Sequence, residues 1–126
     1  MMPLWVVLAL SVAGGLGAVA RFVLDGAITG RIHRTYPIGT TVINVSGSFL
    51  LGVVTALAVA HALPPEWRVI IGVGFLGGYT TFSTASFETV RLALLGRWGP
   101  ALLNGFGMML AAFLAAAVGM LLGSLL

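Results

Sequence analysis

Four long apolar segments set the strongest limit on how this chain can fold. They cover residues 4–24, 40–62, 69–95 and 100–126, and short polar connections separate them. A helix of about 20 apolar residues is long enough to cross the hydrocarbon core of a bilayer. The pattern therefore predicts an all-α integral membrane protein, in which residues 1–126 form a single domain of four transmembrane helices.

The composition agrees with a membrane protein and excludes several classes of function. Hydrophobic residues make up 60% of the chain and charged residues 7%, whereas a soluble domain carries about a quarter charged residues. There is no cysteine, which excludes disulfides and thiolate metal ligands. The net charge of +3 is spread too thinly for a nucleic-acid surface, and it fits loops that meet anionic lipid headgroups.

The third segment has a middle that suits a simple membrane helix poorly. Gly77 and Gly78 lower its helix propensity, and hydroxyl residues follow them in the stretch GFLGGYTTFSTASFE, residues 74–88. Because lipid offers no partners for backbone groups, a helix broken here must be buried in protein or line a wet cavity. Freed carbonyls and half-helix ends at such breaks often form ion sites. A continuous helix with a glycine-lined packing face is the alternative.

The first two segments each contain a polar side chain with two interpretations. Arg21 lies one turn before Asp25, so it either pairs with that acid at the membrane interface or acts as a fixed charge that attracts anions. Asn44 lies about one turn into the second segment, where an unpaired amide is unfavourable. It predicts either an interhelical hydrogen bond or an N–H donor that faces an anion pathway.

The fourth segment has a face of small residues, which predicts close backbone packing, against another helix or against a second copy of itself. This face consists of Gly105, Ala112, Ala116, Gly119 and Gly123. Asn104 is the strongly polar residue of the segment. We expect it near the water boundary, where the helix begins.

Three stretches of the chain resemble the signature segments of the Fluc fluoride channels, also called the CrcB family. They are GGLGAVARF (residues 14–22), PIGTTVINVSGSFLLG (37–52) and GFLGGYTTFSTASFET (74–89). The resemblance covers essentially the whole chain, including the number of spans and the order of the motifs. It implies a multi-pass protein of the cell (plasma or inner) membrane that exports fluoride passively and protects the cell from fluoride toxicity.

The resemblance also implies how such a channel is assembled. Two copies insert antiparallel and form a dual-topology homodimer with two fluoride pores at the interface. A structural sodium ion lies on the twofold axis, where main-chain carbonyls of the broken third helix hold it. By position, these carbonyls belong to Gly77 and Thr80. The expected partners are thus a second copy, fluoride and membrane lipid, the expected cofactor is the sodium ion, and no nucleic-acid partner is expected.

The resemblance places the fluoride pathway at five residues. They are Asn44, Phe82, Ser83, Thr84 and the first-helix arginine Arg21. Fluoride is strongly hydrated, so a narrow route must replace its water with donors, and the amide and hydroxyl groups supply them. An aromatic ring has a positive edge, so Phe82 can face an anion without a full charge that would hold it too tightly.

The chain departs from the family pattern at Ala85, where a second pore phenylalanine is usual. Phe87 is no obvious replacement, because two residues along a helix turn a side chain by about 200°, onto the opposite face. Met108 and Ala112 also stand where similar proteins often have small hydroxyl residues. These departures keep open a second interpretation, a non-conducting partner subunit of a fluoride channel.

Two other classes of function are disfavoured. A small proton-coupled multidrug exporter also has four short spans, but it needs a carboxylate within the membrane. The acids Asp25, Glu66 and Glu88 all lie near expected helix ends. An enzyme is not expected, because no Ser/His, Asp/Asp or metal-ligand constellation lies at membrane depth.

The arginines favour one orientation in the membrane. The connections 25–39 and 95–99, with their flanking helix ends, carry every arginine except Arg68. Positive loops face the cytoplasm, which would place these connections inside the cell. Insertion in both orientations requires the bias to be weak, and the sequence leaves this point open.

Overall fold

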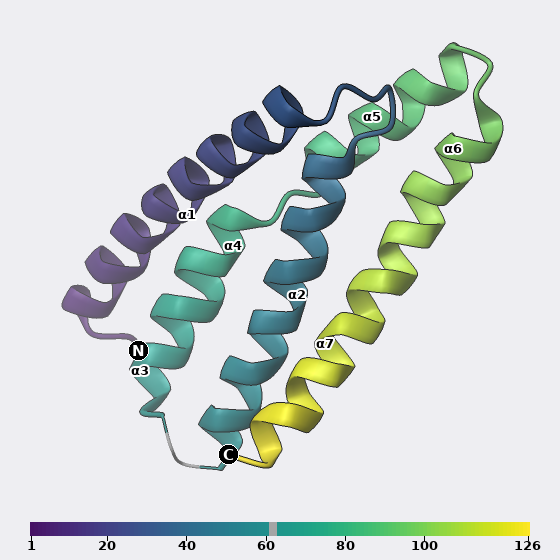
Figure 1. Ribbon diagram of the computed structural model, residues 1–126. Coiled ribbons are helices and arrows are strands. Elements are labelled where there is room, and N and C mark those ends of the chain that lie inside the picture. Colours follow the sequence, from purple (N-terminus) through teal and green to yellow (C-terminus); the bar gives the residue numbers. More distant parts are fainter. Residues whose placement is uncertain (61–62) are drawn as a thin grey trace.

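The computed structural model is all-α and describes residues 1–60 and 63–126. Its four long helical spans are α1 (Leu4–Arg31), α2 (Ile38–Val59), a bent span from Pro65 to Leu94 and a last span from Trp98 to Ser124 (Figure 1). Each is long and apolar enough to cross a membrane. The predicted class, an all-α membrane protein of four spans with a break in the third, is confirmed. The predicted end of the second segment, residue 62, lies outside the described residues.

The first helix continues beyond its predicted end at residue 24 as far as Arg31. The expected connector of residues 25–39 was therefore too long. Gly26 and Gly30 reduce helix propensity but do not end the helix, and a Cβ added at either would meet no described atom within 4 Å. The polar end of α1 is thus an extension of the membrane helix.

The third span consists of four pieces. α3 (Pro65–Arg68) leads into a π-helical segment, η1 (Val69–Leu76), and then into α4 (Gly77–Tyr79). The chain becomes extended at Thr80, with ψ of 160°, before α5 (Ser83–Leu94) begins. The break therefore follows the two glycines of GGYTT, and both glycines are helical.

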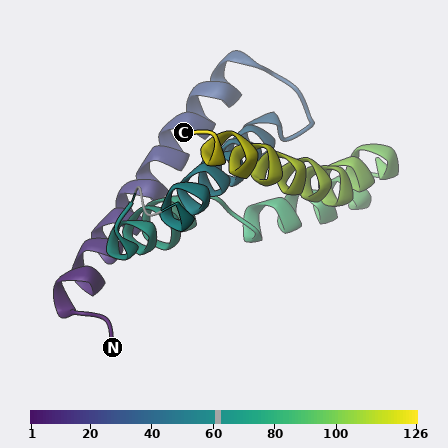
Figure 2. The same cartoon turned by 90° about the horizontal axis from the view of Figure 1, so that it is seen from below.

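The fourth span has a similar change of winding near its start. α6 (Trp98–Leu102) passes into a π-helical segment, η2 (Leu103–Gly107), which continues as α7 (Met108–Ser124). Figures 1 and 2 show α2 in the middle of the molecule, with α1 on one side and the fourth span on the other. The α2 and α7 helices pack along most of their length.

Glycines allow these helices to approach until their main chains touch. A Cβ at Gly17 of α1 would collide with the carbonyl of Phe75, and one at Gly119 of α7 would collide with the carbonyl of Phe49. The small-residue face of the fourth span therefore packs closely, as predicted. Gly119 and Gly123 of this face pack against α2 of the same chain, and Gly105 lies beside Thr89 of α5.

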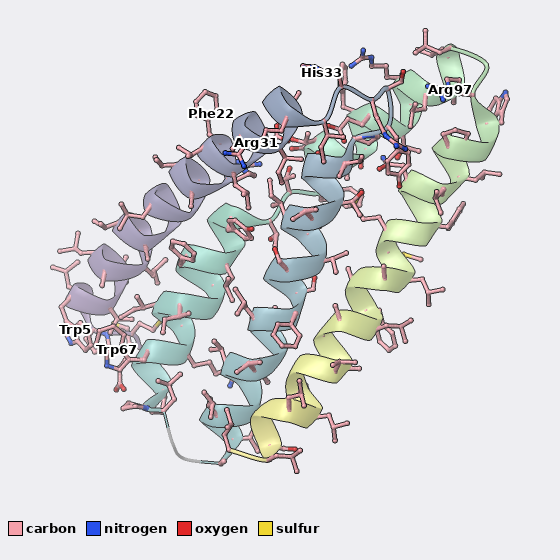
Figure 3. The ribbon with its side chains drawn as sticks, in the orientation of Figure 1. Trp5, Phe22, Arg31, His33, Trp67 and Arg97 are labelled. Atoms are coloured by element: carbon pink, nitrogen blue, oxygen red, sulfur yellow. The ribbon has the colours of Figure 1, made fainter. Side chains whose placement is uncertain are left out.

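The outer surface and the helix ends fit a membrane. The tightly buried core cluster is small and centres on Ile43, Leu76 and Tyr79, while many large apolar side chains are exposed. Trp5 and Trp67 both lie at one end of the bundle, and the opposite end carries polar residues such as Arg97 (Figure 3). Tryptophan is enriched at membrane–water boundaries. The apolar side surface between these ends suits lipid or a protein partner.

Candidate functional site

A cavity of about 580 Å³ lies beside the break in the third span. Among its lining residues are four of those predicted from the sequence: Asn44, Gly77, Thr80 and Phe82. The three departures from the family pattern, Ala85, Met108 and Ala112, also line the cavity. The fold thus brings two of the expected pathway residues and both expected cation residues to one place.

Asn44 is hydrogen-bonded in both directions to the main chain of Thr81. Its Nδ2 donates to the carbonyl oxygen of Thr81 over 2.8 Å, and the N–H of Thr81 donates to Asn44 Oδ1 over 2.8 Å. The same Nδ2 lies 3.2 Å from the sulfur of Met108. The interhelical bond expected of Asn44 is therefore present, and it holds the extended residues of the third span against α2.

This pairing changes the hydrogen bonding of the carbonyls that were predicted to hold a cation. In a continuous helix, the N–H groups of Thr81 and Thr84 would donate to the carbonyls of Gly77 and Thr80. Here the N–H of Thr81 donates to Asn44, and the N–H of Thr84 donates to Thr81 Oγ1 over 3.2 Å. Both carbonyls are thus released from these helical donors, and hard oxygen atoms are the ligands that suit a hard cation.

The remaining pathway residues lie around the cavity in different ways. Phe82 stands immediately before α5 and is 88% exposed. Ser83 is exposed, and Thr84 is half-buried and accepts a 3.1 Å hydrogen bond from Thr81 Oγ1. Ser83, Thr84 and the half-buried Arg21 of α1 lie outside the described lining of the cavity.

Comparison with known proteins identifies the family. The family described as "CrcB-like protein, Camphor Resistance (CrcB)" matches residues 8–120. The chain belongs to the CrcB family. It is 62% identical over 125 residues to the fluoride-specific ion channel FluC 1 of Leifsonia xyli subsp. xyli, a match that covers 99% of this chain and 90% of the relative. It is 52% identical over 126 residues to FluC 2 of Cutibacterium acnes, a match that covers 98% of each chain.

Sequence reasoning missed one polar pair in this CrcB protein. Thr40, which is only 2% exposed, donates a 2.9 Å hydrogen bond to Glu88 Oε1, and Glu88 Oε2 is buried without a described partner. A second cavity of about 360 Å³ adjoins Glu88 and also touches Asp25 and Arg91. No sequence signal pointed to this pair, because it depends on the angle at which α5 leaves the break and crosses α2.

The position of Asn104 was predicted wrongly. It was expected at the water boundary, but it is only 1% exposed and lies in η2. Its Nδ2 donates to the carbonyl oxygen of Ala85 over 3.2 Å and to Thr89 Oγ1 over 2.9 Å. A second asparagine of the CrcB chain, on the fourth span, therefore also holds the third span.

Proposed function

We propose that the protein is a fluoride-specific channel of the cell membrane that lets fluoride leave the cell down its gradient and so protects against fluoride toxicity. The observation that carries this proposal is the 62% identity, over 99% of the chain, to a protein named as a fluoride-specific ion channel. Membership of the CrcB family also disfavours the multidrug exporter and an enzyme. A channel needs no covalent chemistry, only a route that replaces the water around the ion.

The donors for fluoride are the Asn44 amide and the hydroxyls of Ser83 and Thr84. One Asn44 N–H proton is engaged by the Thr81 carbonyl, and the other faces the sulfur of Met108. A thioether is a weak acceptor, so fluoride can take that second proton without breaking the pair with Thr81. Phe82 adds the positive edge of an exposed ring, and Arg21 adds a positive charge that draws anions towards the pathway.

The carbonyls of Gly77 and Thr80 hold a structural sodium ion. The support for this site is their release from the helical donors at residues 81 and 84. A bound sodium supplies a fixed positive charge next to an anion pathway. Replacing sodium with N-methylglucamine in all solutions should lower fluoride efflux and the melting temperature of the purified protein, and no change in either measurement contradicts the site.

The channel is an antiparallel homodimer with two pores. The exposed ring of Phe82 and the cavity beside it are features that a second copy can cover and complete. A second candidate role, a partner subunit for a different chain, is favoured by the arginines. Arg31, Arg34, Arg91 and Arg97 belong to the end of the molecule that holds the connection from α1 to α2, and Arg68 belongs to the other end.

The orientation of the C-terminus separates these two candidates. A cysteine is added at the C-terminus, and a membrane-impermeant thiol reagent is applied to the outside of whole cells and to inside-out vesicles; the chain has no cysteine of its own. Labelling from both sides supports the antiparallel homodimer. Labelling from one side only would exclude it and support a partner subunit.

Fluoride efflux from liposomes tests the function directly, with wild type, Phe82→Ile and Ala85→Phe compared. Isoleucine keeps apolar volume but removes the ring edge, so flux should fall on the order of tenfold or more. The added ring of Ala85→Phe should raise flux if its absence limits conduction. A wild type that moves no fluoride while Ala85→Phe does would identify the non-conducting subunit. Flux that is indifferent to Phe82→Ile would defeat the role of the ring.

A further inference from the structure

Asn104 forms a closed set of hydrogen bonds with two residues of α5, Ala85 and Thr89. Its Nδ2 donates to the carbonyl of Ala85 and to Thr89 Oγ1, and Thr89 Oγ1 itself donates to the Ala85 carbonyl over 2.8 Å. The amide orientation is fixed by this arrangement, because the opposite orientation would place two oxygen acceptors against each other at 3.2 Å. The amide therefore links the fourth span to a main-chain atom of α5.

The backbone of η2 approaches α5 closely at this link. Gly105, the next residue, lies so close to α5 that an added Cβ would stand 3.3 Å from Thr89 Cγ2. The short asparagine side chain can reach a main-chain carbonyl only at such an approach. The link also falls within η2, and π-helical insertions in α-helices are frequent at functional sites.

The position of α5 depends strongly on such polar links. Among the described residues, Leu92 is the one that α5 buries, and it lies in the last turn of the helix. The first two turns thus have no tightly buried apolar side chain to fix their rotation. Asn104 Oδ1 is buried without a described partner, a penalty that a leucine of similar size would avoid. Packing alone therefore gives no reason for an asparagine here.

We propose that Asn104 is a positioning residue for ion conduction, which sets the rotation of α5 and thereby the placement of Phe82, Ser83 and Thr84 along the fluoride pathway. This role rests on the proposed channel function. Asn104 acts through the Ala85 carbonyl and the Thr89 hydroxyl and does not itself contact the ion. Its loss lets the first turns of α5 rotate, so both the rate of fluoride passage and the rejection of chloride change.

The test compares fluoride and chloride efflux from liposomes for the full chain and matched variants. Asn104→Leu removes the donors and keeps the volume, Thr89→Val removes the hydroxyl and keeps the shape, and the double variant combines them. Ser11→Ala is the control, because Ser11 Oγ bonds only the carbonyl of Val7 on its own exposed helix face among the described residues. All proteins are melted in parallel to separate stability from flux.

Asn104→Leu should slow fluoride efflux on the order of tenfold and raise chloride efflux relative to fluoride, and Thr89→Val should have about a two- to threefold effect. The double variant should match Asn104→Leu, because both changes disable one link. A lower melting temperature with unchanged flux and selectivity would overturn the positioning role. If Asn104→Leu fails to fold, Thr89→Val tests the proposal in its place. Wild-type flux and selectivity in Thr89→Val would then overturn the positioning role of Asn104. A wild type without fluoride flux overturns the channel function itself, and the role of Asn104 with it.

Discussion

The two halves of the third span are held in the molecule by different forces. Before the break, η1 and α4 bury Ile70, Leu76 and Tyr79, and they press their main chain against α1 at glycines. A Cβ at Gly78 would collide with the carbonyl of Gly14, so this contact leaves no room for any side chain. Close packing therefore fixes this half in one position.

Beyond the break, hydrogen bonds hold the span in place more than apolar packing does. They join Asn44 to Thr81, Thr40 to Glu88, and Asn104 to Ala85 and Thr89. A few hydrogen bonds are weaker than a packed interface but they are directional, so they place polar groups accurately where an apolar core could not. The first half should therefore respond most to added volume, and the second half to the loss of single polar groups.

Added volume in the first half should have the largest effect. Gly17→Ala places a methyl group against main-chain atoms of Phe75 and Tyr79, which have no freedom to move away. Overpacking of this kind costs about 1–3 kcal/mol, and a main-chain clash lies at the upper end. We expect a clear fall in folded protein, measured by size-exclusion chromatography and thermal melting.

Gly15→Ala is the matched control for this change. It adds the same methyl group on the same helix, but that group meets no described atom within 4 Å. Gly15→Ala should behave as wild type or melt slightly higher, since alanine is the better helix former by about 1 kcal/mol. Equal folded yields for the two variants would show that close packing does not hold this half.

Loss of the hydrogen bonds between Asn44 and Thr81 should have the next largest effect. We expect this effect on conduction. Asn44→Leu leaves the N–H and the carbonyl of Thr81 without their partner, at about 1–3 kcal/mol for each group that stays buried. We expect fluoride efflux to fall on the order of tenfold or more. The control is Ser46→Ala, which removes a 3.0 Å bond to Tyr79 in the packed half. If Ser46→Ala reduced flux as much as Asn44→Leu, the contrast between the halves would be wrong.

The same contrast explains how much of the structure the sequence could predict. The spans follow from apolar length, and the break was predicted from Gly77, Gly78 and the hydroxyl residues after them, all of which are visible in the chain. The glycines themselves are helical, and the chain becomes extended only at Thr80. The burial of Asn104 could not be predicted from such local properties. Hydrophobic periodicity indicates which face of a helix is buried but does not show which neighbour covers it, so a polar residue near a predicted helix end was assigned to water. The pairing of Thr40 with Glu88 needs the angle of α5 after the break, which no local pattern contains.

A smaller effect is expected at the bond between α2 and the middle of α5. Thr40→Val removes the donor to Glu88 Oε1 and keeps the shape of the side chain. The carboxylate then has no described donor while it stays half-buried, so we expect fluoride efflux to fall about three- to tenfold. Thr41→Val is the control, because Thr41 Oγ1 bonds the carbonyl of Pro37 near the start of α2. An equal loss of fluoride efflux in Thr40→Val and Thr41→Val would mean that both act through the stability of α2 and that the bond to α5 has no special role.

Replacing the sulfur next to Asn44 should have the smallest effect on fluoride efflux. Whether efflux rises or falls is more informative than how far it changes. Met108 is only 5% exposed, and its sulfur lies 3.2 Å from Asn44 Nδ2. Met108→Leu nearly conserves the side-chain volume, so the loss in free energy of unfolding should stay below about 1.5 kcal/mol. The Asn44 proton then loses a weak acceptor that competes with fluoride, and efflux should rise about two- to threefold. A fall in efflux would mean that the sulfur orients the amide for the ion, and Met108 would then belong with the hydrogen bonds that position the second half of the span.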